Sequence, residues 1–147
     1  MASFNKFNCF VENLAEKMHN LGADTLKVFL TNTAPNASTN TAYDGTTGST
    51  GPAEIAAGNG YTAGGNSATI SSSSQTSGTY KLVLADPSTW TASGGSIGPF
   101  RYAVLYNDTA SPKGLIGYWD YSTSITLLAG ETFTVDFDPT TGVLTLG

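Results

Sequence analysis

The second half of the chain alternates short apolar segments with clusters of turn-forming residues. Between residues 79 and 147, about five segments of strand length are separated by groups of Gly, Pro, Asp and Ser. Alternation of apolar and polar side chains indicates half-buried β-strands, and the intervening clusters favour turns. The clearest strand patterns are residues 80–84, 101–106, 115–121 and 132–137. Residues 101–106 are apolar on both faces, which suits a central strand. Residues 132–137, with Phe133, Val135 and Phe137 inward, are expected to form a hairpin with residues 143–146. This pattern predicts a mainly β fold with antiparallel sheets.

One amphipathic helix is expected before the sheets. Apolar residues recur every three to four positions over residues 3–21, which is the helical period. Ser3 is positioned to cap its start, and Gly22 follows its last turn. The apolar stripe includes Phe4, Phe7 and Phe10. We expect this stripe to be buried against the domain's own sheet or against a neighbouring subunit.

These patterns divide the chain into an N-terminal helix, residues 1–22, and a single β-domain, residues 23–147. The β-domain has roughly seven or eight short strands, a number and spacing typical of an antiparallel β-sandwich, jelly roll or barrel. A long polar loop at about 33–60 is too polar to contribute to a core and is a candidate contact surface. The serine run at 71–74 is expected to form a mobile turn after an edge strand.

Charge restricts the classes of partner. The net charge is −5, and the six basic residues are spread along the chain, whereas a phosphate backbone requires clustered Lys and Arg. Nucleic acid is therefore not an expected partner. No window approaches the ~18 apolar residues of a membrane span, and residues 1–21 lack the apolar core of a signal peptide. We expect a soluble protein that is synthesised in the cytoplasm and has no membrane partner.

Residues able to do covalent chemistry are scarce. His19 is the single histidine and Cys9 the single cysteine, so neither a zinc site nor an internal disulfide is expected. We interpret His19 as structural and Cys9 as a small buried apolar residue. The glycine-rich segment 58–65 lacks the Lys-Ser/Thr pair that closes a phosphate loop. The sequence thus predicts no catalytic, cofactor-binding or metal-binding residue, and no enzyme.

Two weaker patterns allow other interpretations. Asp136 and Asp138 lie two apart in a predicted strand and could face a bound cation. The outward face of a half-buried strand is where acidic residues normally lie, which favours solvated charges instead. Four aromatic residues could form a sugar-binding platform or fill the core and its rim: Trp90, Tyr118, Trp119 and Tyr121. Strand alternation predicts that Trp119 and Tyr121 share one face, with Tyr118 on the other.

Several segments, in this order, are similar to small structural proteins of tailed bacteriophage virions. They are residues 56–61, 80–86, 90–95, 101–108, 115–121 and 130–135, and the 26–35 segment fits the same pattern. The resemblance covers almost the whole chain after the expected helix. Its motifs are not catalytic signatures, and their specificity lies in their joint order.

The resemblance implies a non-enzymatic capsid decoration, or cement, protein that binds and stabilises the capsid shell. It implies that the partners are the major capsid protein and further copies of this chain, and that the location is the capsid surface of the virion. A tail or neck (connector) protein is the close alternative. A carbohydrate-binding or adhesin module is a second alternative, and a small hydrolase a third. No binding residue can be transferred from the resemblance.

Overall fold

The computed structural model describes residues 2–147 and confirms a mainly β fold. These residues contain one helix, α1, and ten strands. The elements are β1 (Phe4–Lys6), α1 (Cys9–Ala15), β2 (Leu26–Thr31), β3 (Asn66–Ala68), β4 (Ile70–Thr76), β5 (Thr79–Leu84), β6 (Trp90–Thr91), β7 (Ile97–Asn107), β8 (Leu115–Leu127), β9 (Thr132–Phe133) and β10 (Leu144–Leu146).

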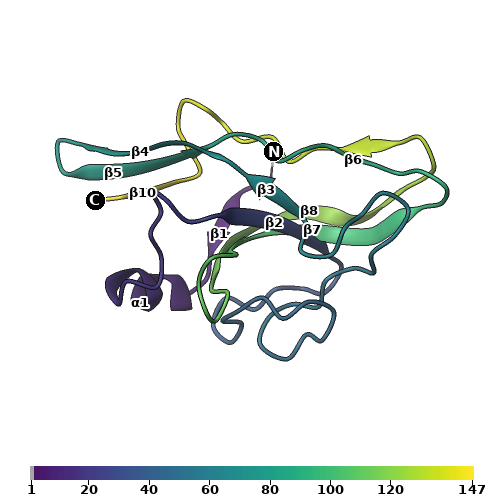
Figure 1. The fold of residues 1–147 in the computed structure, drawn as a ribbon, viewed down its shortest axis with the longest axis horizontal. Coiled ribbons are helices and arrows are strands. Elements are labelled where there is room, and N and C mark those ends of the chain that lie inside the picture. Colours follow the sequence, from purple (N-terminus) through teal and green to yellow (C-terminus); the bar gives the residue numbers. More distant parts are fainter. Residues whose placement is uncertain (1) are drawn as a thin grey trace.

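The strands form three antiparallel sheets. A five-stranded sheet has the order β1-β8-β7-β2-β3, a three-stranded sheet has the order β10-β5-β4, and β6 pairs with β9. Figure 1 shows the two smaller sheets above the five-stranded sheet, with α1 and the segment between β2 and β3 below it. Strand β7 lies between β8 and β2, so the prediction that residues 101–106 form a central strand is confirmed.

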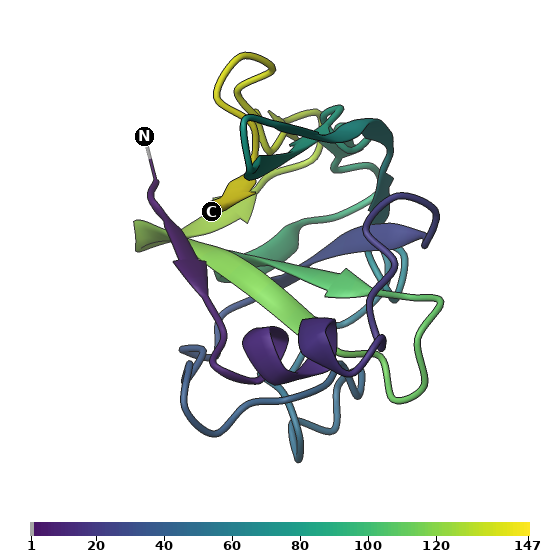
Figure 2. The same cartoon turned by 90° about the vertical axis from the view of Figure 1, so that its left-hand side faces the viewer.

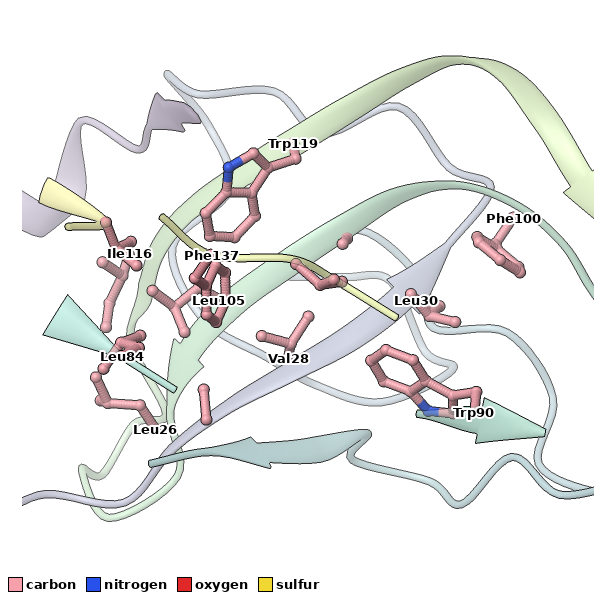
Figure 3. Packing of buried hydrophobic residues seen from close by; sticks show 14 of the residues in the cluster. Leu26, Val28, Leu30, Leu84, Trp90, Phe100, Leu105, Ile116, Trp119 and Phe137 are labelled. Carbon is pink, nitrogen blue, oxygen red and sulfur yellow. The ribbon is translucent and has the colours of Figure 1, made fainter. Parts of the chain in front are cut away.

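An inner core fills the space between the five-stranded sheet and the smaller sheets (Figure 3). Alternate residues of β2, such as Val28 and Leu30, point into it and meet Leu82 and Leu84 of β5. Trp90 is also buried there. Full burial of a large apolar side chain contributes roughly 1.5–3 kcal/mol relative to exposure, so this layer is the main source of stability.

The opposite face of the five-stranded sheet carries a second, outer core. Its buried members are Phe7, Phe29, Val104, Tyr106 and Leu115. Residues 32–65, here called the 32–65 loop, cover this face together with the N-terminal segment, as Figures 1 and 2 show. Tyr43 of the loop stacks on Tyr106, with ring centroids 4.4 Å apart. The expectation that the loop is too polar to contribute to a core was therefore wrong.

The N-terminal helix is much shorter than the predicted 3–21 segment. Phe4 lies in β1 opposite Trp119, because pairing with β8 satisfies the backbone and packs the Phe4 ring on that indole. The helix begins after Asn8 rather than Ser3. It ends at Ala15, and Lys17 adopts a left-handed φ of 66°, so Gly22 does not end it. The apparent helical periodicity here reflects partial burial of Phe4 and full burial of Phe7 and Phe10, each in a different local structure.

The C-terminal pairing also differs from the prediction. Only Thr132–Phe133 of the predicted strand 132–137 forms a ladder, and its partner is β6. Strand β10 pairs with β5 and not with residues 132–137. Val135 and Phe137 still point inward as predicted, because the segment crosses the open side of the inner core. The serines at 71–74 belong to β4 and not to a turn.

Two glycines with left-handed backbones differ in what surrounds them. Gly65 (φ 70°) lies against β2, where an added Cβ would overlap the carbonyl oxygen of Val28, while Gly78 (φ 86°) has open space. We expect Gly78→Ala to cost about 1–2 kcal/mol of unfolding free energy through backbone strain alone. Gly65→Ala adds overpacking of about 1–3 kcal/mol and should cost clearly more. Urea denaturation of both variants tests this difference, and equal losses would contradict it.

Candidate functional site

His19 is oriented by a chain of polar side chains. It is 5% exposed, and its Nδ1 lies 3.1 Å from the Asn107 side-chain nitrogen, which also donates to Asp24 at 2.6 Å. An amide nitrogen can only donate, so Nδ1 accepts and the ring is neutral with its proton on Nε2. Burial lowers the pKa of His19, partly opposed by Asp24. Within residues 2–147 this histidine makes no hydrogen bond to a hydroxyl or thiol that it could activate.

Cys9 holds α1 against the 32–65 loop and β8. Its Sγ lies 3.6–3.7 Å from the carbonyl oxygens of Asn40, Thr41 and Leu115. Burial is the main cause that raises the pKa of this thiol. A reactive cysteine requires a lowered pKa, so the contacts support a packing role.

The predicted aromatic platform is mostly core. Trp90 is 1% exposed and Trp119 is 8% exposed, with Phe4 and Phe137 each about 5 Å from the Trp119 ring centroid. Tyr121 packs beside Trp119 in the inner core, while Tyr118 joins the outer core, which confirms the predicted alternation. Neither indole offers an open face for stacking on a sugar.

The two predicted carboxylates are exposed, on the side of the 134–143 segment opposite the core. Asp136 and Asp138 alternate with buried Val135 and Phe137. Asp138 accepts hydrogen bonds from the backbone N–H groups of Thr140 and Thr141, and so stabilises a turn. No group of three or more His, Cys, Asp or Glu in the described part of the chain is placed to hold a metal ion.

A groove of about 490 Å³ lies between β8 and the 134–143 segment. Its lining includes Phe4, Trp119, Tyr121 and Asp136. Burial, with the nearby Asp136 charge, raises the pKa of Tyr121 to about 12, so the hydroxyl stays protonated at neutral pH. The groove thus brings together four of the candidate residues from the sequence, Trp119, Tyr121, Asp136 and Asp138. Trp90, Tyr118 and His19 do not line it.

The most elaborate polar cluster is one that sequence reasoning missed. Glu54 in the 32–65 loop is 5% exposed and accepts hydrogen bonds from the hydroxyls of Tyr43 and Tyr61 and from the Gly64 N–H, each at 2.7 Å. The Tyr61 hydroxyl in turn accepts from the backbone N–H of Leu30 at 3.0 Å. The only sequence signal for this cluster is Glu54 itself, a single acidic residue within the short apolar stretch 53–57.

This cluster fastens the 32–65 loop to the sheet. Hydrogen bonds to a charged acceptor contribute about 1.5–3 kcal/mol each, more than neutral ones. Burial is the largest cause that raises the pKa values of Tyr43 and Tyr61, so both hydroxyls remain donors. The loop also donates from Ile55 N–H to the Leu30 carbonyl at 3.1 Å. These contacts hold the 32–65 loop, and therefore its exposed surface, in one conformation.

Half of the cations are engaged in ion pairs. Lys27 and Lys113 both pair with Asp108, and Arg101 makes a double hydrogen bond with Asp120. These pairs are partly exposed and contribute little stability. Because each of these three basic side chains faces a carboxylate, they do not form a positively charged patch.

Comparison with known proteins identifies no relative. No protein-family model, curated protein or solved structure matches this chain. The single helix of the described residues is too short and too polar to cross a membrane.

Replacing Glu54 should loosen the 32–65 loop. We expect Glu54→Leu to lose about 3 kcal/mol of unfolding free energy or more, because the buried Tyr61 hydroxyl, the partly buried Tyr43 hydroxyl and the Gly64 N–H then lack an acceptor. Glu54→Gln should lose less, since its remaining oxygen can still accept from Tyr61 and Gly64. The control is Glu16→Gln, at an exposed position. Urea denaturation gives the ranking, and hydrogen exchange should locate faster amides in the loop; equal effects at positions 54 and 16 would refute this role.

Lowering the pH should destabilise the fold through His19. Its folded-state pKa is below the ordinary 6.5, so both states are neutral above that pH. As the pH falls through the unfolded-state value, only the unfolded chain binds the proton, and stability decreases. His19→Gln, which can still accept from Asn107, should lose this part of the pH dependence. Unfolding free energies between about pH 7.5 and 5.5 measure it; identical slopes for wild type and variant would contradict the assignment.

Proposed function

We propose that this protein is a non-enzymatic structural protein of a tailed-bacteriophage virion, a decoration (cement) protein that binds the capsid shell and stabilises it. The observation that carries the proposal is the 32–65 loop, whose exposed surface is held rigidly by the buried Glu54 cluster. A long ordered loop on a stiff scaffold is suited to binding. The resemblance in the order of the sequence motifs supplies the biological context.

The arrangement of the sheets supports this proposal. We infer that the five-stranded sheet and the two smaller sheets act as a β-sandwich of the jelly-roll class, with the inner core between them. Side chains that could do chemistry are used for structure: His19 is hydrogen bonded to Asn107, and Cys9 contacts backbone carbonyls. A rigid domain of this kind functions through its surface.

Surface chemistry supports assembly with protein partners. Only 12% of residues are charged. Few ionic groups must lose their hydration when such a surface packs against a neighbour. We propose the major capsid protein and further copies of this chain as the partners, with the protein made in the host cytoplasm and located on the capsid surface.

The structure limits which parts can make these contacts. Phe7 and Phe10 of the predicted apolar stripe are at most 1% exposed, so they are not available to another subunit. The exposed tip of the loop at 46–50 and Val11, which is 53% exposed on α1, remain accessible. A carbohydrate-binding function would be favoured by an open aromatic face, and neither Trp90 nor Trp119 provides one.

Cryo-electron microscopy of intact particles from a lysate containing this protein tests the proposal. We expect its density in many copies at the symmetry axes of the capsid, with the 32–65 loop or α1 facing the shell. Density at six or twelve positions on the neck or tail would replace the decoration role with the connector role. Absence of the protein from the particle would refute a virion function.

A further inference from the structure

Strand β4 has an outer edge without a partner. It is the last strand of the three-stranded sheet and pairs only with β5. Apart from that ladder, its backbone makes no hydrogen bond to any other segment of residues 2–147. In an antiparallel pair, every second residue of an edge strand directs its N–H and C=O away from its neighbour. These groups remain free to pair with another strand.

The other sheet edges are protected in ways that β4 is not. Strands β1, β3 and β10 have three residues each, and β1 carries Lys6. Strand β8 continues beyond the end of β1, and this part of its edge has no partner strand among residues 2–147. It contains Ser122, which has a φ of 70° and donates its backbone N–H to Asp120. Short length, charge and irregular backbone are the usual means of blocking edge pairing.

Strand β4 is long and uncharged, and its pairing is irregular only at its start. It spans seven residues, and after one irregularity near Ile70 its pairing with β5 is continuous from Ser72 to Thr76. A two-residue turn, Ser77-Gly78, with φ values of 51° and 86°, closes this hairpin. Residues 69–80 contain no charged residue and no proline. Figure 1 shows the β4–β5 hairpin extending beyond the rest of the molecule, so another chain can approach it.

We propose that β4 pairs edge to edge with β4 of a second copy of this chain. An antiparallel pair about a two-fold axis would join two three-stranded sheets into one continuous sheet. Two copies of a chain with net charge −5 repel each other overall, and pairing through the uncharged β4 strand adds no direct like-charge contact to that repulsion.

This pairing adds to the proposed function, because it supplies a contact between copies of the protein. A role for the pairing on a capsid therefore rests on the proposed decoration function. The self-association itself is a property of the isolated protein. A single strand edge buries less surface than the ~1,600 Å² of a standard interface. We therefore expect a reversible, concentration-dependent dimer in solution, which neighbouring contacts on a particle would reinforce.

A charge-swap experiment at Ser72 tests the pairing. Ser72 is exposed on β4, opposite Val83 of β5. Ser72→Lys and Ser72→Glu each place like charges across the two-fold axis. Each variant alone should weaken the dimer at least about tenfold in sedimentation equilibrium, which corresponds to about 1.4 kcal/mol. An equimolar mixture of the two should recover association, because opposite charges then face each other.

Two controls separate this result from misfolding and from other interfaces. Ser93→Lys adds the same charge at an exposed position outside β4 and should leave the dimer unchanged. In the wild type, alternate amides of β4 should exchange more slowly with deuterium as protein concentration rises. A wild type that stays monomeric, a dimer insensitive to both Ser72 variants, or failure of the mixture to recover association would each overturn the proposal. Capsid binding by a protein that does not self-associate would refute only this pairing and leave the decoration role intact.

Discussion

Strands β2 and β7 carry large apolar side chains on both faces, so the rest of the fold must shield both faces of the sheet from water. Leu30 and Leu105 point into the inner core, while Phe29 and Val104 point into the outer core. The smaller sheets cover one side. Within residues 2–147 no sheet covers the other side, and the N-terminal segment and the 32–65 loop cover it instead (Figures 1 and 2). Burial of apolar area, the dominant favourable contribution to folding, therefore depends on an irregular segment.

Covering an apolar face with a loop brings backbone polar groups into a dry environment, where each requires a partner. The Glu54 carboxylate meets part of this requirement by accepting from Tyr43, Tyr61 and Gly64. Thr31 adds a hydrogen bond from its hydroxyl to the Ala53 carbonyl at 2.5 Å. These bonds make the loop a third layer of the domain. The same bonds give its outer surface the rigidity that the proposed capsid contact needs.

The buried polar side chains of this protein form hydrogen bonds that hold the fold together, and this use of polar groups bears on the proposed function. Partly buried Asp24 and buried Asn107 and His19 form a hydrogen-bonded chain near the end of the five-stranded sheet, and Glu54 organises the loop. Along β4, the accessible groups are an unpaired backbone edge and small hydroxyl side chains. Such groups are suited to pairing with other proteins, because their hydrogen bonds are made on contact and few charges lose hydration.

The sequence by itself determined the mainly β class, the central position of residues 101–106 and the opposite directions of Trp119 and Tyr118, since each follows from the two-residue period of a strand. The tertiary structure decided the rest. Phe4 joins a strand because β8 offers it a partner, and β10 pairs with β5 because of how the 134–143 segment crosses the core. The Glu54 cluster likewise unites residues from separate turns of an irregular loop. Strand partners and loop contacts depend on chain segments far apart in sequence, and local periodicity carries no information about them.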